Sequence, residues 1–297
     1  MTPLPHGMRV TFSSALIDEG TVASQIGSRL WEQQPRVESL ASAMLDSNHV
    51  ASVALTDVSN LYAVSTDYFH AFARLLRMEE TFGPSLAALV RGFIEASGRL
   101  WWLLSSESPE ELAYRAAMMQ LGEARMAAKR GVRSARVFAN GGHEEISAEK
   151  AVEEAEALLA RVRVPGGEET VPGYTALATA VLEAAGVADP VMEYSHLSGA
   201  AHGEAGTNVG FSGRRRDASD GDVAAYTLGL PIRNANMYFW DVDHVLDLLL
   251  QRMIDLWGIE AERERWSASR ARVHTTLDTL FQLLKELPEV EELRAGR

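Results

Sequence analysis

The sequence contains no cysteine among its 297 residues. Disulfide bonds, thiolate catalysis and cysteine-ligated metals are therefore excluded as features of this chain. Basic residues are also scarce, because 28 lysines and arginines stand against 41 aspartates and glutamates, for a net charge of −13. Since phosphate contacts need clustered lysine and arginine, this balance argues against a nucleic-acid partner.

Long apolar runs are absent as well. The nearest candidate, residues 84–104, is interrupted by Arg91, Glu95 and Arg99, which argues against a membrane span. The first residues, MTPLPHGMRV, lack the basic-then-apolar order of a signal peptide. We expect a soluble cytoplasmic protein with no membrane partner.

Helical periodicity is the main positive feature of the sequence. Apolar residues recur at three-and-four spacing, and alternation with period two is confined to short stretches. These patterns predict an all-α fold, a multi-helix bundle with a kinked late helix and a long C-terminal helix. Pro231 is expected to kink or break the helix predicted for residues 222–257. The C-terminal helix carries an apolar seam that suits a bundle edge or a homodimer contact, formed by Trp266, Val273, Leu277, Leu280, Leu284 and Leu287.

Proline and glycine indicate where the helices are interrupted. Residues 1–20 contain Pro3, Pro5 and Gly7 and are predicted to be a flexible leader. Residues 21–290 are predicted to form one helical domain, and residues 291–297 a tail. Within that domain the Gly-, Ser- and Arg-rich segment 203–221 is expected to be a mobile loop, and residues 132–146 a connector.

The stretch DPVMEYSHLSGAAHG, residues 189–203, carries the functional prediction. Asp189 and Pro190 form a helix start, and Gly203 is a suitable stop. Between them, Tyr194, Ser198 and His202 are spaced four residues apart, so they share one face of the helix. A phenol, a hydroxyl and an imidazole on one face are groups that can perform acid–base chemistry.

A second helix, predicted for residues 85–105, supplies possible partners. It is apolar on most sides, so its Arg91 and Glu95 need partners, either each other or groups of the 189–203 helix. We therefore predict a polar pocket in which His202 is the acid or base and a small molecule is the substrate or ligand. Its residues would be Arg91, Glu95, Trp102, Tyr194, Ser198 and His202, with Arg91 and Trp102 as ligand contacts.

A purely structural interpretation of the same residues is also open. A buried tyrosine or serine often bonds only to backbone, and a histidine at a helix end often caps carbonyl groups. Arg91 and Glu95 would then be an ordinary surface pair at i and i+4.

The Arg91-x-x-x-Glu95 pair, the following WWLL and the later Tyr194-x-x-Leu197-Ser198-x-x-x-His202-Gly203 together resemble a pattern of uncharacterised all-helical bacterial proteins, many of them actinobacterial. The resemblance covers about residues 85–202. Some such families are similar to HEPN domains, helical bundles that include metal-independent ribonucleases whose motif is an arginine, then four to six residues, then a histidine. His202 matches that histidine, but Ser195, His196 and Leu197 stand where the arginine would be. The resemblance implies the fold, with ribonuclease or toxin activity as an alternative.

A metal site is the third possibility. Glu193-x-x-His196 and Asp241-x-x-His244 are both carboxylate-x-x-histidine pairs on predicted helices. Ferritin-like di-iron bundles use two Glu-x-x-His helices and one glutamate from each of two others. Glu95 and Glu123 would be those glutamates. Our first expectation is that no cofactor is bound, and a di-iron oxidase is the alternative.

Overall fold

The computed structural model describes residues 5–32, 49–78, 83–139, 142–162, 170–208, 211–214 and 226–285. Within these residues the chain forms ten helices and two antiparallel two-stranded hairpins. The fold is all-α, as the sequence predicts. In the described part of the chain, no helix is long and apolar enough to span a membrane.

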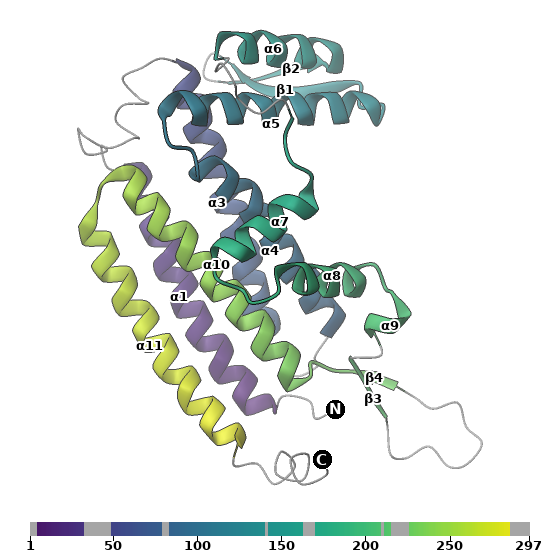
Figure 1. The fold of residues 1–297 in the computed structure, drawn as a ribbon, viewed down its shortest axis with the longest axis vertical. Helices are drawn as coiled ribbons and strands as arrows, with labels where there is room; N and C mark the ends of the chain where they lie inside the picture. Colours follow the sequence, from purple (N-terminus) through teal and green to yellow (C-terminus); the bar gives the residue numbers. More distant parts are fainter. Residues whose placement is uncertain are drawn as a thin grey trace.

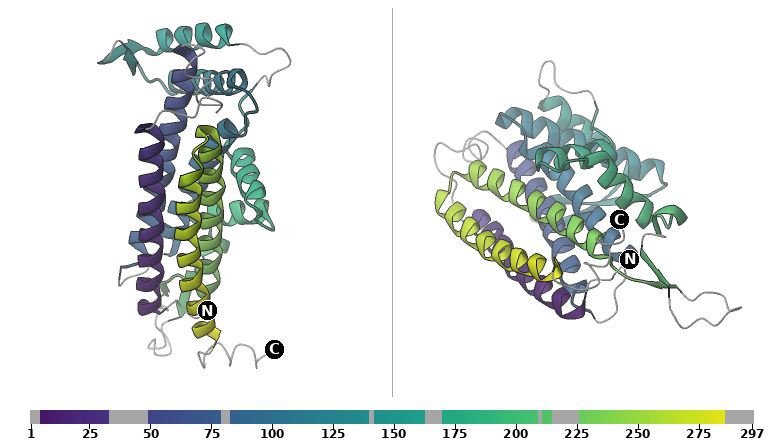
Figure 2. Two further views of the ribbon diagram at one scale, coloured as in Figure 1. Left: turned by 90° about the vertical axis from the view of Figure 1, so that its left-hand side faces the viewer. Right: turned by 60° about the horizontal axis from the view of Figure 1, so that its bottom comes forward.

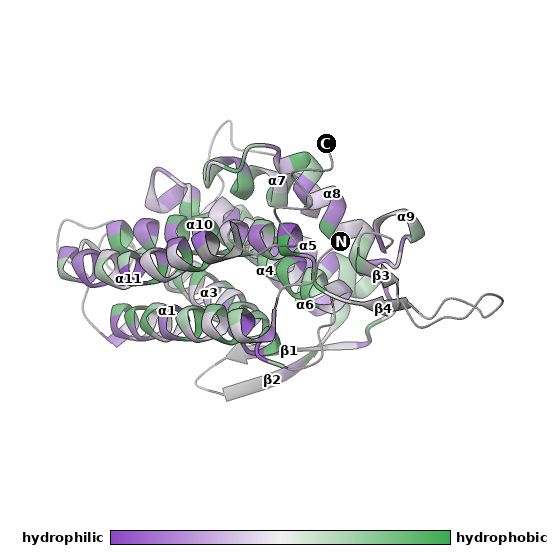
Figure 3. Ribbon diagram, turned by 90° about the horizontal axis from the view of Figure 1, so that it is seen from below, coloured by the Kyte–Doolittle hydropathy of each residue, from purple (hydrophilic) through white to green (hydrophobic). Residues whose placement is uncertain are grey.

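Five long helices build the body of the molecule (Figure 1). They are α1 (His6–Glu32), α3 (His49–Leu75), α4 (Gly83–Leu104), α10 (Ile232–Trp257) and α11 (Glu260–Lys285). Helix α4 packs against α3 and α10, and α1 packs against α3 and α11. Each long helix carries both hydrophobic and hydrophilic residues (Figure 3), as amphipathic bundle helices do.

A second layer crosses one end of the bundle. It consists of α5 (Pro109–Lys129), α6 (Ala148–Arg161) and the hairpin of β1 (Ser134–Ala139) and β2 (Gly142–Ser147), and Figures 1 and 2 both show it lying across the long helices. A serine caps the first turn of each of its two helices: Ser108 Oγ accepts a hydrogen bond from the Glu111 amide at 3.1 Å, and Ser147 Oγ accepts one from the Lys150 amide at 3.2 Å.

A third group of elements lies on the flank of α4. It comprises α7 (Tyr174–Ala184), α8 (Pro190–Ala201), the single turn α9 (Ala205–Asn208) and the short hairpin of β3 (Ser212–Arg214) and β4 (Tyr226–Leu228). Both α7 and α8 pack directly on α4, and α7 also contacts α8. This packing determines where the candidate site forms.

Three boundaries differ from the sequence predictions. Residues 6–20 are not a leader: they are the first half of α1, because Phe12 and Leu16 recur at helical spacing and are buried in the core. Pro231 breaks the helix expected for residues 222–257 rather than kinking it, the second of the two predicted outcomes: α10 begins directly after Pro231, which is its N-cap residue with a φ of −64°. Residues 134–147 are a hairpin rather than a connector, with Ser134 paired to Ser147 and Ala139 to Gly142.

Two other predictions fall partly on residues outside the described ones. Within the expected loop 203–221, residues 205–208 and 212–214 belong to α9 and β3, and residues 209–210 and 215–221 lie outside the description. The tail predicted for residues 291–297 lies entirely outside it.

The apolar seam of the C-terminal helix is used inside the chain. Trp266, Val273, Leu277 and Leu280 are all buried by the chain's own core. The side chains of Leu284 and Leu287 are not among those described. A homodimer formed through the four buried residues would have to pull α11 away from the bundle, so the seam does not support that prediction.

Gly98 allows α4 and α7 to touch, and it yields a test of the packing. A Cβ atom there would lie 2.6 Å from the carbonyl oxygen of Leu177 in α7, and a backbone atom cannot move aside. We expect Gly98→Ala to lower the free energy of unfolding by about 1–3 kcal/mol, measured by urea denaturation.

Gly122→Ala is the matched control for this substitution. Gly122 also lies inside a long helix, α5, but has nothing within 4 Å of its Cβ position. Alanine there should stabilise the protein by about 0.5–1 kcal/mol. Similar effects of the two substitutions would contradict the close approach of α4 and α7.

Candidate functional site

Helix α8 is anchored at both ends by the residues that the sequence singles out. Asp189 Oδ1 accepts a hydrogen bond from the Met192 amide at 3.0 Å, and Pro190 occupies the first helical turn. Gly203 follows the helix with a φ of +74°, a left-handed conformation that suits glycine. Tyr194, Leu197 and Ala200 are buried, so the helix turns the side bearing Tyr194 towards the protein.

A chain of polar contacts joins α8 to α4. Arg91 Nε donates to Glu95 Oε1 at 2.7 Å, and Tyr194 Oη donates to the same oxygen at 2.8 Å. Arg91 Nη1 lies 2.8 Å from Nε2 of His202. The Arg91 guanidinium also lies 5.9 Å from the centre of the Tyr194 ring. The structure therefore brings together Arg91, Glu95, Tyr194 and His202, which we call the Arg91 cluster.

The contact with Arg91 fixes the protonation of His202. A guanidinium can only donate hydrogen bonds, so Nε2 of the imidazole must be the acceptor. His202 is then neutral in this arrangement, with its proton on Nδ1. Because the ring is exposed, a molecule arriving from solvent can reach it.

Glu95 stabilises the protonated forms of both Arg91 and Tyr194. The side chains of Arg91 and Glu95 are only 20% and 24% exposed, so their interaction is partly shielded from water. Burial, followed by the hydrogen bond to Glu95 and its charge, raises the pKa of Tyr194, which keeps the phenol protonated and donating. Burial alone would lower the pKa of Arg91, but the Glu95 hydrogen bond and charge raise it overall. The guanidinium is thus a permanent cation.

Two residues of the predicted pocket, Ser198 and Trp102, do not belong to the Arg91 cluster. Ser198 is half-buried, and its carbonyl rather than its hydroxyl contacts His202, accepting from the His202 amide at 3.0 Å. Trp102 lies on the same side of α4 as Arg91 but about 16 Å further along the axis, at 1.5 Å per residue. Its ring packs under Arg115 of α5, 5.4 Å from the guanidinium, so the structure does not bring Trp102 into the Arg91 cluster.

The six residues of the di-iron alternative are divided among separate sets of contacts. Glu95 belongs to the Arg91 cluster, and Glu123 is ion-paired with Arg99. Glu193, His196 and Asp241 lie between α8 and α10, and His244 lies 4.0 Å from Asp243. Over the described residues, no group of three or more histidine and acidic side chains is arranged to hold a metal ion. The geometry therefore gives the di-iron alternative no support, although it stays a prediction.

The far side of α8 forms a second polar contact, with α10. His196 Nε2 lies 2.8 Å from the hydroxyl of Tyr238, and its ring stacks on Phe211 at a centroid distance of 5.8 Å. Beside them, burial and the charge of Glu193 raise the pKa of Asp241 to about 8. Burial and Asp189 likewise raise the pKa of Glu193. At neutral pH Asp241 is therefore protonated, which lets it remain in the core.

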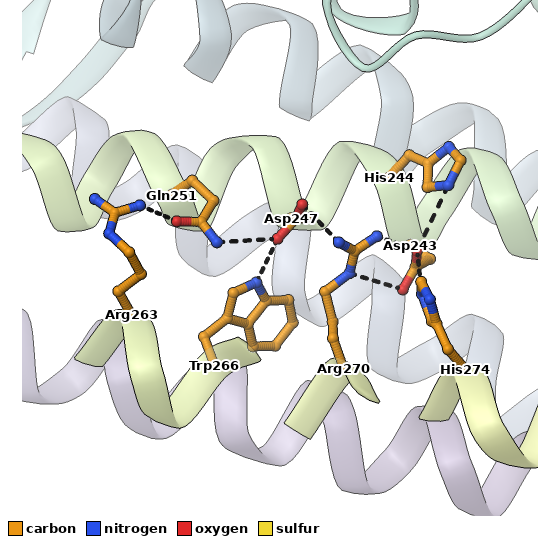
Figure 4. A network of polar contacts seen from close by, with 8 residues as sticks. All are labelled: Asp243, His244, Asp247, Gln251, Arg263, Trp266, Arg270 and His274. Carbon is orange, nitrogen blue, oxygen red and sulfur yellow. Dashed lines mark hydrogen bonds and ion pairs between the residues drawn. The ribbon is translucent and has the colours of Figure 1, made fainter. Parts of the chain in front are cut away.

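A third set of polar contacts, which was not predicted from the sequence, joins α10 to α11 (Figure 4). Asp243 is completely buried and accepts from Arg270 Nη2 at 2.5 Å and from His274 Nε2 at 3.1 Å. Arg270 Nη1 also reaches Asp247 at 2.6 Å, and Trp266 Nε1 donates to Asp247 at 2.7 Å. These hydrogen bonds attach the polar side of α11 to α10.

A buried carboxyl of α1 completes this third set. Glu19 is fully buried next to Asp243, and burial together with the Asp243 charge raises its pKa well above the usual range. For Asp243 itself, the hydrogen bonds from His274 and Arg270 outweigh burial and lower the pKa. The pair therefore holds one proton, on Glu19, and one negative charge, on Asp243, which Arg270 balances.

A signal for this network was present in the sequence. Asp243, Asp247 and Gln251 repeat every four residues along an otherwise apolar helix, which is a polar stripe. Arg263, Trp266, Arg270 and His274 form a stripe of hydrogen-bond donors at matching spacing on the next helix. Two complementary stripes on consecutive helices indicate that the helices face each other.

Comparison with known proteins adds no relationship to this geometry. No protein-family model matches the chain, and neither a curated protein nor a solved structure is significantly similar to it. The geometry and chemistry of the Arg91 cluster and the other polar contacts are therefore the basis for a functional proposal.

Asp241 makes the stability of the protein depend on pH. The pKa of Asp241 is raised to about 8 in the folded state from the ordinary aspartate value of 3.8, so between these two values only the unfolded state releases the proton. The contribution of Asp241 to the free energy of unfolding is therefore full below pH 4. It decreases as the pH rises to 8, by up to about 1.4 kcal/mol per pH unit. We expect Asp241→Asn to flatten this loss between pH 5 and 8, measured by urea denaturation across that range.

Asp18→Asn, a change of an exposed carboxyl on α1, serves as the control and should keep the wild-type slope. A wild-type slope in Asp241→Asn as well would show that Asp241 is not the group responsible.

Proposed function

We propose that the Arg91 cluster binds a small anionic molecule and that His202 exchanges a proton with it. The 2.8 Å contact between Arg91 Nη1 and His202 Nε2 is the observation that supports this proposal most directly. It joins a permanent cation to a neutral imidazole at an exposed position. These are the two groups that an acid–base reaction on an anionic molecule requires.

The cluster suggests how a ligand would engage. A ligand oxygen that accepts the hydrogen bond from Arg91 Nη1 would release Nε2 of His202, whose lone pair is then free to take a proton from the same ligand. Glu95 and Tyr194 would act as positioning residues, because their hydrogen bonds hold the guanidinium in place. The reaction would thus need only a displacement of one hydrogen bond at the surface.

Phenyl phosphate is a suitable probe of this proposal. On its addition, we expect the ring NMR signals of His202 to shift while those of His274, which is hydrogen-bonded to Asp243 in a separate set of contacts, stay unchanged. Arg91→Gln should weaken binding by about tenfold or more, since a hydrogen bond to a charged group contributes roughly 1.5–3 kcal/mol.

Arg125→Gln is the matched control, because Arg125 is an exposed arginine that pairs with Glu156 elsewhere on the surface. An unchanged His202 signal, or equal losses of affinity in the two arginine variants, would remove the proposal.

Metal-independent cleavage of RNA is the second candidate, and the same contact favours it. The linear HEPN motif lacks its arginine, but Arg91 of α4 stands beside His202 in space. His202 could take the proton of a ribose 2′-hydroxyl, and Arg91 could balance the negative charge that builds on the phosphate. The net charge of −13 limits any RNA-binding surface to a small one.

A single-stranded oligoribonucleotide incubated with the purified protein in EDTA tests this candidate. We expect cleavage to be lost in His202→Ala and in Arg91→Gln, and retained in Arg125→Gln. A wild-type protein that leaves the RNA intact would exclude ribonuclease activity while leaving the binding of small anions open.

A further inference from the structure

A groove of about 390 Å³ lies along α1, away from the Arg91 cluster and sharing no residue with it. Its volume is within the range of about 300–1,000 Å³ that is usual for small-molecule sites. One residue of α3 and five of α1 line it: His70, and Thr21, Ser24, Gln25, Ser28 and Arg29. Each of these six side chains carries a hydrogen-bonding group.

The hydroxyl of Ser24 contacts another helix, unlike those of Ser14 and Thr21 on the same helix. Ser14 and Thr21 each donate to the carbonyl four residues earlier, at 2.9 and 2.7 Å, which is the ordinary arrangement inside a helix. The hydroxyl of Ser24 instead lies 3.0 Å from Nε2 of His70 on α3. A serine hydroxyl that contacts an imidazole is the arrangement of a nucleophile and its base.

Gly20 lets His70 come this close to α1. A Cβ at position 20 would lie 2.9 Å from Cε1 of His70 and 2.8 Å from the ring of Phe69, so a larger residue would push α3 away. Gly20 is also one helical turn before Ser24, so the ring fits in the space left by the glycine and reaches the hydroxyl.

The surroundings keep His70 in its basic form. Burial, and then the nearby charge of Arg74, lower the pKa of His70, while Asp67 opposes them. From α1, Arg29 lines the same groove with its charge paired to Glu262 of α11 at 2.6 Å. At neutral pH the imidazole is therefore uncharged, and with the proton on Nδ1 its Nε2 can accept the Ser24 hydroxyl proton.

We propose that Ser24 is a nucleophile activated by His70, and that this groove accepts a small carboxylic ester. Ser24 Oγ forms a bond to the ester carbonyl carbon while its proton passes to Nε2 of His70. The bond from carbon to the leaving oxygen then breaks, and His70 returns the proton to that oxygen, which leaves as an alcohol. The serine is left as an ester, which water hydrolyses with His70 again as base.

Neighbouring side chains can stabilise the oxygen that becomes negative. Gln25 and Ser28 line the groove beside Ser24. Gln25 accepts a hydrogen bond from Arg265 through Oε1, which leaves its amide nitrogen to donate. An amide and a hydroxyl donor are groups that serve this purpose in acyl transfer.

The whole 297-residue chain, with p-nitrophenyl acetate as probe, tests the proposal. We expect a burst of p-nitrophenol equal to one per chain and a single acetyl group, located on Ser24 by peptide mass spectrometry. Ser24→Ala should abolish the burst, and His70→Gln should slow acetylation by about 10²-fold or more. Thr21→Val, the control in the same groove, should keep it, because the Thr21 hydroxyl is bonded to the Ile17 carbonyl and has no part in the proposed reaction.

The pH dependence of the acetylation rate distinguishes activation of Ser24 by His70 from unassisted acetylation of a surface side chain. This measurement uses the wild-type protein, so it does not require His70→Gln to fold. The rate should rise with pH and then level off, with a midpoint below pH 6.5, the ordinary pKa of histidine, because His70 is neutral above that midpoint. A wild-type protein without a burst, a burst that survives Ser24→Ala, or a rate that keeps rising through the alkaline range would each overturn the proposal.

Discussion

Burying a charged group inside a helical bundle requires a partner on another helix, and this requirement organises the polar interior of the protein. An ionised side chain in a core costs several kcal/mol unless a counter-charge or hydrogen bonds compensate for it. Asp243 meets the requirement through Arg270 and His274 of α11, and Arg91 meets it through Glu95 and the residues of α8. Asp241 and Glu19 avoid the cost by holding a proton instead.

The properties that lie within one helix could be predicted from the sequence. The caps at Ser108, Ser147 and Asp189, the all-α class and the joint position of Tyr194 and His202 follow from spacing and residue type. The Arg91–Glu95 pair was also predictable, because its members are four residues apart. Such features need no knowledge of which helices are neighbours.

The properties that depend on how helices face each other were predicted less well. Trp102 was expected beside Arg91 because eleven residues bring a side chain back to the same side of a helix, yet the distance along the axis separates them. His274 was overlooked because its partner, Asp243, lies 31 residues earlier, on the preceding helix. The hairpin of β1 and β2 was missed although Asn140-Gly141 between its strands is a strong hairpin signal, because the strands are short.

The two polar sides of α8 explain why His202, and not His196, is the histidine to associate with proton exchange. His196 is held between Phe211 and Tyr238, and burial and then Arg233 lower its pKa, so it stays neutral and has a hydrogen-bond partner already. His202 is at the exposed end of the same helix, and its partner is the guanidinium of Arg91. Moving a proton requires access to solvent or ligand as well as a lone pair. Of the two imidazoles, only that of His202 combines an exposed position with contact to a cation that an anionic molecule could bind.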